Sequence, residues 1–194
     1  RDRSVSRGLG DVYKRQTLFE RRCDMQKFYD YINKAIISRP TMVTKEEYQP
    51  VITNDKIGLL SNSFDTNIAT SAFLSFDVVK CDTLELVGEI GFQATLYDEF
   101  FYGGNVDYTV YDSFQHQGYG TQSLSLLKEL LQQNTYAMKE GILISTLPDN
   151  IYSQRIAIKN GGILIYDGLV PRNTSLYQID HVEKVKIYQI QMKK

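Results

Sequence analysis

The sequence is poor in the features that mark several large classes of protein. It has two cysteines, Cys23 and Cys81, which lie far apart and lack the spacing of metal ligands. A disulfide framework and a metal site are therefore both disfavoured. No apolar run approaches the ~20 residues that span a bilayer, and no secretory signal is evident. We expect a cytoplasmic protein with reduced thiols, no metal and no membrane partner.

An excess of positive charge is also absent. The net charge is -1 over 194 residues, and no basic stripe is present, which argues against nucleic acid as the main partner. The chain has no internal repeat and no low-complexity segment. Its composition, with 42% hydrophobic and 23% charged residues, is that of a globular protein, and its length suits one domain with a full core.

The first sixteen residues differ from the rest of the chain. They hold five basic and two acidic residues and show no apolar periodicity. They are similar to a translated sequencing-adapter remnant. We therefore expect residues 1–16 to be a disordered, non-native segment and residues 17–194 to form a single domain. The biological start is then Met25, or it lies upstream of this fragment.

Hydrophobic periodicity predicts the order of the elements. Thr44 to Glu47 has the form of a capping box, although Pro50 limits any helix there to about one turn. Leu74, Phe76 and similar apolar residues alternate with polar ones on both sides of a turn at residues 81–83, which predicts an antiparallel hairpin. Helices are expected over residues 18–37, from the glycine loop described below to about 139, and from Asn150, and strands near residues 57–60, 72–80, 84–93, 105–111, 142–146, 162–170 and 183–192.

The segment Gln115 to Thr121, with the sequence Gln-His-Gln-Gly-Tyr-Gly-Thr, is the most informative part of the chain. It follows a strand pattern in which Val106, Tyr108 and Val110 share one face, and it precedes a helical pattern of leucines. Two glycines allow a sharp turn and a close approach to a ligand. The free N–H groups of the first helical turn then form a cup suited to a phosphate. The segment matches neither the dinucleotide fingerprint nor the P-loop.

The spacing Gln-x-x-Gly-x-Gly resembles the acyl-CoA pyrophosphate loop of the GNAT superfamily of N-acetyltransferases. Residues 149–162 resemble the family's next helix, and residues 86–92 resemble its central hairpin, so the resemblance covers about residues 71–170. It points to the branch that includes ribosomal-protein N-terminal acetyltransferases. The order of elements and the resemblance both imply an α+β fold, with a mixed, largely antiparallel central sheet flanked by helices.

The resemblance also implies a binding site for acetyl-CoA as co-substrate. In this reading the Tyr108 amide polarises the acetyl carbonyl and Val110 pairs along the pantetheine arm. Asn150 and Ser153 are retained from the family's helix. A plain helix cap explains Thr121, and an N-cap explains Asn150, about as well as ligand contact does. The residues of the pyrophosphate loop assigned to the cofactor are Gln115, Gln117, Gly118, Tyr119, Gly120 and Thr121.

The acceptor amine needs a group that takes up its proton. Asp77, Glu85, Glu89 and Asp107 lie on mixed strand faces and would form an acidic wall if these faces point into one cleft; otherwise each is a solvated carboxylate. Glu89 and Asp107 are the preferred catalytic pair, together with the Tyr108 amide. The two histidines, His116 and His181, are interpreted as a solvated loop residue and a structural residue.

The chain departs from the family at two positions. Many relatives carry a tyrosine that protonates the leaving thiolate, where this chain has Ala157, and an aromatic residue where it has Gly162. Tyr166 is one conceivable replacement, and Tyr152 is not well placed. We predict an N-acetyltransferase that acts on a primary amine of a small molecule or a protein N-terminus by direct transfer. The alternatives are a non-catalytic acyl-CoA-binding module and a plain interaction domain. The acceptor and the oligomeric state stay open.

Overall fold

The computed structural model describes residues 42–62, 73–93, 101–133 and 141–192. The chain divides into two units, residues 1–41 and residues 42–194, and all described residues belong to the second unit. The boundary expected at residue 16 and the helix expected over residues 18–37 lie outside the described residues.

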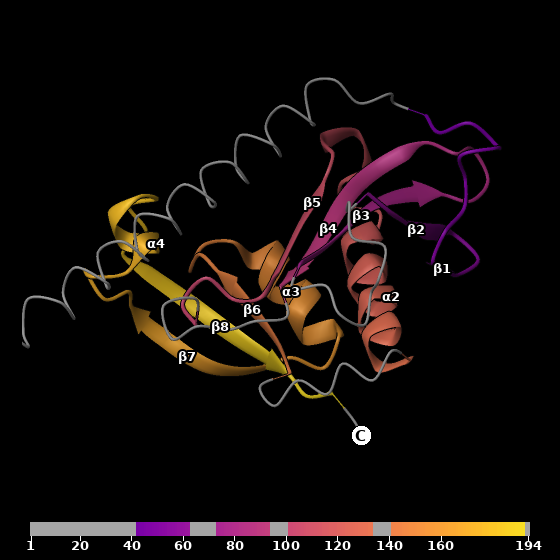
Figure 1. Ribbon diagram of the computed structural model, residues 1–194. Helices are drawn as coiled ribbons and strands as arrows, with labels where there is room; N and C mark the ends of the chain where they lie inside the picture. The colour runs from indigo at the N-terminus through magenta and orange to yellow at the C-terminus, as the bar shows by residue number, and fades with distance from the viewer. Residues whose placement is uncertain (1–41, 63–72, 94–100, 134–140, 193–194) are drawn as a thin grey trace, which may run out of the picture. The chain divides into compact units, whose positions relative to one another are not determined.

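Five strands form an antiparallel sheet in the order β1-β2-β3-β4-β5 (Figure 1). The strands are β1 (Ile52–Thr53), β2 (Ile57–Ser61), β3 (Phe73–Lys80), β4 (Leu86–Gln93) and β5 (Val106–Val110). The short β1 was not expected from the sequence. Alternation along β3 and β4 places Phe76 opposite Ile90, and both side chains are almost fully buried. One face of this sheet is therefore apolar, as the period of two requires.

Helix α2 (Tyr119–Gln133) covers the apolar face of the five-stranded sheet. Its leucines recur three and four residues apart, so they form one stripe. Leu124, Leu127 and Leu131 are fully buried in the cluster that also contains Phe76 and Ile90. The helix begins directly after the glycine loop, so the packing of this stripe also positions the loop.

A second antiparallel sheet has the strand order β6-β8-β7. Its strands are β6 (Ile142–Thr146), β7 (Ile163–Leu169) and β8 (Lys184–Ile190), and the helices α3 (Ile151–Lys159) and α4 (Ser175–Gln178) lie between them in the chain (Figure 1). Helix α3 packs against α2 and β8. It ends as the sequence predicts, because Gly161 takes a left-handed conformation with φ +87°.

The two sheets meet where β5 and β6 begin, and one buried amide connects them there. The Asn105 N–H donates to Leu143 O at 2.9 Å. Its side chain accepts from the Leu143 N–H at 2.7 Å and donates to Gly141 O at 3.1 Å. β5 and β6 share no further ladder and separate beyond this point, since the bridge between Gly104 and Ile144 is isolated.

The expectation of an α+β fold with a largely antiparallel sheet flanked by helices is confirmed. Every strand pair among the described residues is antiparallel. The capping box is also present, since the Glu47 N–H donates to the Thr44 hydroxyl and the Glu47 carboxylate accepts from the Thr44 N–H. No helix among the described residues is long and apolar enough to cross a membrane.

Candidate functional site

A cavity of about 540 Å³ opens between the glycine loop, strand β5 and helix α3. It brings together nine of the residues that the sequence assigns to a cofactor: Tyr108, Val110, Gln115, Gly118, Tyr119, Gly120, Thr121, Asn150 and Ser153. Gln117 does not line the cavity, and neither Glu89 nor Asp107 does. Six further residues line it: Phe114, His116, Tyr152, Arg155, Ile156 and Lys159.

The two glycines of the loop are needed for different reasons. Gly118 has φ +87°, a conformation that L side chains rarely adopt, and a Cβ there would make an ordinary van der Waals contact with Gln122 Nε2 at 3.8 Å. Gly120 has ordinary dihedrals, but a Cβ there would lie 2.8 Å from Ile156 Cδ1 of α3 and 3.4 Å from Val110 Cγ2 of β5. Gly118 therefore turns the chain, and Gly120 lets the start of α2 pack closely between α3 and β5.

The backbone amides of the loop are available to a ligand. Within the described residues, the N–H groups of residues 116–121 donate no hydrogen bond. The first helical bond runs from the Gln122 N–H to Gly118 O at 3.1 Å, which leaves the preceding amides at the N-terminus of a 15-residue helix without an acceptor. Such a cluster of donors at the positive end of a helix fits a diphosphate.

The loop glutamines stabilise the turn with their side chains. Gln115 donates through Nε2 to Val110 O at 3.2 Å and to Asp112 Oδ1 at 2.9 Å. Gln117 donates to Ser113 O at 3.2 Å. At position 117 the backbone amide is therefore the group that can face a ligand, whereas the Gln115 N–H, like its side chain, is used within the protein, since it donates to Asp112 O at 3.3 Å.

The N–H group of Tyr108 lies on an open strand edge. The Tyr111 N–H donates to Val87 O at 3.0 Å, and Asn105 O accepts from the Gln93 N–H at 2.9 Å. Backbone groups alternate in direction along a strand, so those of Tyr108 and Val110 point away from β4. β5 is the last strand of its sheet, and these groups therefore face the space where β6 has separated.

An acidic row crosses the other face of the same sheet. Asp77 pairs with Glu89, Glu89 pairs with Thr109, and Gly91 pairs with Asp107. The side chains of Asp77, Glu89 and Asp107, the acidic row, therefore project from the face opposite Tyr108 and Val110. Glu85, which was considered with them, is instead bound to Lys80 beside the β3–β4 turn at 3.0 Å.

Each member of the acidic row has a distinct environment. Glu89 Oε1 accepts from the Tyr111 hydroxyl at 2.8 Å, and Asp77 Oδ1 accepts from Asn62 Nδ2 at 2.8 Å. The Asp107 carboxylate lies over Gly91, where a Cβ would be 2.6 Å from its Oδ1. The side chain keeps access to solvent, yet the surrounding protein partly desolvates the carboxyl group. This desolvation, with a smaller contribution from the Glu89 charge, raises the pKa of Asp107 above its ordinary value of 3.8.

Residues 18–163 match the family model described as the acetyltransferase (GNAT) domain. The chain belongs to the GNAT family. No curated protein sequence is significantly similar to it.

Several solved acetyltransferase structures are similar to the chain. An acetyltransferase from Salmonella typhimurium that modifies the N-terminal serine of ribosomal protein L7/L12 shares 18% identity over 63% of this chain and 66% of its own, with a TM-score of 0.47. The ribosomal-protein-S5-alanine acetyltransferase from Vibrio fischeri shares 13% identity over 63% of each chain, with a TM-score of 0.48. A GNAT-family acetyltransferase from Bacillus anthracis shares 15% identity over 62% and 67%, with a TM-score of 0.48. The chain thus spans less than two thirds of the length of the first two.

Two basic residues of this cavity were not expected from the sequence. Arg155 and Lys159 lie one turn apart on α3, and both line the cavity. Their spacing of four residues was a usable signal, since it puts both on one helix face, but that face could be oriented only once the packing of α3 was known. His116 also lines the cavity, and its ring contacts Tyr152 edge to face with centroids 4.8 Å apart.

Helix α3 carries the two departures from the family pattern. Ala157 is fully buried in the main core cluster, so the position lacks both a hydroxyl group and room for an aromatic ring. At Gly162, a Cβ would lie 2.8 Å from Ala157 O. Asn150 caps the helix by accepting from the Ser153 N–H at 3.0 Å, as its N-cap interpretation requires. Among the described residues, no group of three or more His, Cys, Asp or Glu side chains could hold a metal ion.

Proposed function

We propose that the protein transfers an acetyl group from acetyl-CoA to an amine by direct attack, without a covalent enzyme intermediate. The observation that carries this proposal is the set of N–H groups at residues 116–121, which have no acceptor in the described part of the chain and lie at one end of a cavity that continues along the open edge of β5. A diphosphate and an extended arm are the two parts of a ligand that such a surface suits.

The donor is held by backbone and cationic groups. The amides of Gly118, Tyr119 and Gly120 donate to the diphosphate, while Arg155 and Lys159 on the facing helix add positive charge. The arm then pairs with the open edge of β5 at the Val110 N–H, as an added strand would, since Val110 O already accepts from Gln115 Nε2. This arrangement directs the acetyl group toward Tyr108.

The carbonyl is polarised by the Tyr108 N–H on that edge. A preorganised donor aimed at the developing oxyanion is worth about 3 kcal/mol in acyl transfer. Since the donor is part of the backbone, its contribution is insensitive to the side chain at this position.

The acceptor amine approaches from the acidic row. An alkyl ammonium ion is attracted to Glu89 and Asp107 and must lose a proton before it can attack. Asp107 is a stronger base than an ordinary aspartate, because its pKa is raised toward neutrality. Replacing either residue should lower kcat near neutral pH and leave acetyl-CoA binding intact.

A non-catalytic acyl-CoA-binding module is the second candidate. The buried Ala157 favours it, because that helix position supplies no proton donor for the thiolate. This module would use the same donor site, so the two candidates differ in turnover rather than in binding.

The test measures thiol release from acetyl-CoA over a panel of amines. The panel contains a polyamine and peptides that begin with serine or alanine, the acceptors named for similar proteins. We expect turnover on at least one amine and, at acetyl-CoA concentrations of 100 times Kd, a gain in stability of ~2.7 kcal/mol. Stabilisation without any turnover would favour the binding module, and no stabilisation would contradict both.

Two glycine variants make the test specific to the loop. Gly118→Ala and Gly161→Ala both introduce a side chain at φ +87°, so each should lose about 1–2 kcal/mol of stability. Only Gly118→Ala disturbs the amides, and we expect it to raise the KM for acetyl-CoA by about tenfold, the effect of losing one charge-assisted hydrogen bond. An equal rise in Gly161→Ala would show that the effect is general instability.

A further inference from the structure

Acetyl transfer also requires stabilisation of the leaving thiolate, and neither the loop amides nor the acidic row provides it. When the amine nitrogen has bonded to the carbonyl carbon, the C–S bond breaks and its electron pair stays on sulfur. The free thiol has a pKa near 8.5, so a nearby donor that stabilises the thiolate would speed this step at neutral pH. The donor must line the cavity and lie toward the open edge of β5 rather than beside the phosphate loop.

Three tyrosines line the cavity, and their positions differ. Tyr152 is 55% exposed and contacts His116 of the loop. Tyr119 is the first residue of α2, and its ring packs on Phe114 with centroids 6.3 Å apart. Both therefore lie at the phosphate end. Tyr108 lies two residues before Val110 on β5, about 7 Å farther along the open edge, and it is half-buried.

The Tyr108 phenol reaches across the cavity to α3. Its hydroxyl lies 2.6 Å from Ser153 Oγ and 3.3 Å from Ser153 O. Ala157 follows Ser153 by one helical turn, and it packs in the same core cluster as the Tyr108 ring. The strand thus brings a phenolic hydroxyl to the helix face that bears only a methyl group at Ala157.

We propose that the Tyr108 phenol is the proton donor to the leaving thiolate and that Ser153 positions it, an inference that rests on the proposed acetyl transfer. As the C–S bond breaks, the Tyr108 Oη proton moves to sulfur. The phenolate recovers a proton from solvent through the Ser153 hydroxyl, and the proton lost by the amine leaves through Asp107. One amide and one thiol form, and the protein returns to its starting state.

The environment of the phenol suits this role. Burial raises the pKa of Tyr108, and the hydrogen bond with Ser153 opposes the rise only in part. The hydroxyl group therefore carries its proton at neutral pH and is available as a donor. The same residue then supplies both the backbone N–H for the oxyanion and the side chain for the thiolate.

The test follows the ionisation of the coenzyme A thiol in the binary complex with the protein. Titration of the thiolate ultraviolet absorbance should give a lower thiol pKa in the wild-type complex than in the Tyr108→Phe complex, because the phenol stabilises the thiolate. We expect the thiolate-to-thiol ratio at a fixed pH to fall about tenfold in the variant, as for the loss of a hydrogen bond to a charged group. kcat should fall with KM for acetyl-CoA nearly unchanged.

Tyr166→Phe is the matched control. It also removes a phenol that donates to a backbone carbonyl, Leu169 O at 2.6 Å, but Tyr166 does not line the cavity. We expect no change in thiol ionisation in this variant. Ser153→Ala keeps the donor and loses its orientation, so it should lower kcat by less than Tyr108→Phe does.

The outcomes separate this inference from the proposed function. Failure of wild-type protein to bind coenzyme A would overturn both. Binding with the same thiolate ratio in wild type and Tyr108→Phe would overturn only the role of Tyr108. If Tyr108→Phe does not fold, a fluorinated tyrosine at position 108 keeps the shape and makes the phenol more acidic. It should increase the bound thiolate ratio, and an unchanged ratio would overturn the inference.

Discussion

The Asp107 carboxylate lies beside a glycine of the adjacent strand. It lies over Gly91, so it is held against the sheet while it keeps contact with solvent. The protein removes part of its hydration, and among the described residues no basic side chain contributes to the shift of its pKa. A carboxylate in this position is less stable than one in water, and its greater basicity is the counterpart of that loss.

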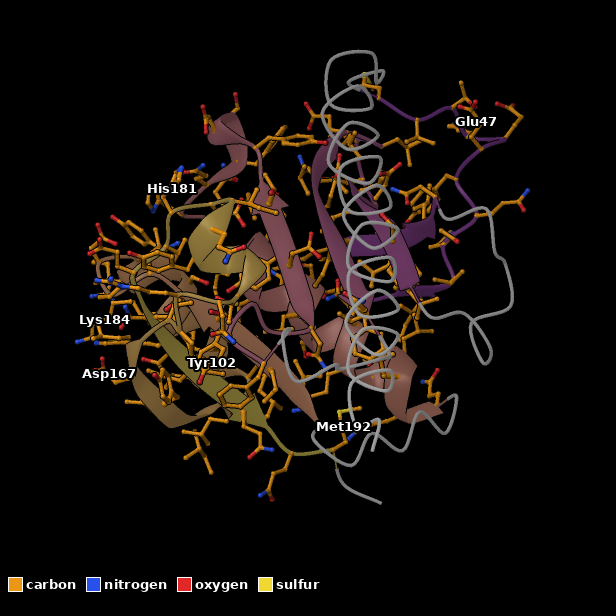
Figure 2. The ribbon with its side chains drawn as sticks, turned by 60° about the vertical axis from the view of Figure 1, so that its left-hand side comes forward. Glu47, Tyr102, Asp167, His181, Lys184 and Met192 are labelled. Atoms are coloured by element: carbon orange, nitrogen blue, oxygen red, sulfur yellow. The ribbon has the colours of Figure 1, made fainter. Side chains whose placement is uncertain are left out.

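The first prediction compares Asp107→Asn with Asp167→Asn. The raised pKa of Asp107 means that its ionisation costs stability as pH rises above the ordinary value, so Asp107→Asn should be more stable than wild type at neutral pH. The hydrogen bond from Lys184 at 2.9 Å lowers the pKa of Asp167, and the two residues lie together on the neighbouring strands β7 and β8 (Figure 2). Asp167→Asn should therefore be less stable.

Chemical denaturation at several pH values checks this pair. The gain in Asp107→Asn should shrink as pH falls from the raised pKa of Asp107 to the ordinary value of 3.8, and the loss in Asp167→Asn should shrink as pH falls from 3.8 through the lowered pKa of Asp167. Each carboxyl group is protonated in both the folded and the unfolded state only below the lower of its two pKa values. In the Asp107 variant, higher stability should accompany lower kcat. A loss of stability at neutral pH in Asp107→Asn would contradict the desolvated environment.

At the scale of the element, helix α3 has a capped first turn and one side that lines the cavity. Asn150 accepts from the Ser153 N–H, which fixes the first turn, and Ser153 in turn contacts the Tyr108 hydroxyl. Arg155 and Lys159 continue along the cavity. The cap therefore sets the position of every group that this helix presents to the donor.

The second prediction concerns that cap. Asn150→Ala should lower the free energy of unfolding by about 1 kcal/mol, whereas Asn150→Ser retains an acceptor and should restore it. If the side chain acts only as a cap, the affinity for coenzyme A follows the same order and is restored in Asn150→Ser. Calorimetric titration measures it, and weak binding by a stable serine variant would instead assign Asn150 to the ligand.

Most elements could be predicted because their patterns are local. Strict alternation predicted β3 and β4, the leucine stripe predicted α2, and Gly161 predicted the end of α3. The glycine loop could be assigned to a diphosphate because its spacing resembles the acyl-CoA loop of the GNAT family. The acidic row was only partly predictable, since pairing registers put Glu89 beside Asp77 and left Glu85 at the hairpin turn with Lys80. The reach of Tyr108 to Ser153 depends on how β5 and α3 pack, which no local pattern contains.

At the scale of the described domain, Asn105 makes buried hydrogen bonds at the junction of the two sheets. Asn105 is 4% exposed, and its side chain satisfies Gly141 O and the Leu143 N–H across the junction. Beyond this junction β5 and β6 diverge, which leaves the edge of β5 free for a ligand. The hydrogen bonds of Asn105 therefore fix the point at which β5 and β6 separate.

The third prediction is that Asn105→Ala lowers the free energy of unfolding by roughly 2–5 kcal/mol, because two buried backbone groups lose their partners. Asn54→Ala is the matched control. Asn54 Oδ1 also accepts two backbone bonds, from the N–H groups of Lys56 and Ile57 at 2.8 and 2.9 Å, but water can replace it at this partly exposed turn, so its loss should cost about 1 kcal/mol. Equal losses in thermal or urea unfolding would contradict the role given to Asn105.

Strand β5 serves two surfaces with alternate residues: Tyr108 and Val110 on one side, Asp107 and Thr109 on the other. Because the proposed nucleotide contacts and the acidic row have no side chain in common, a substitution in the row leaves the loop amides where they are. Substitutions in the acidic row can thus change the acceptor specificity during evolution, while the residues that bind the acyl carrier stay the same. Such modularity is a condition for one scaffold to diversify in its acceptors.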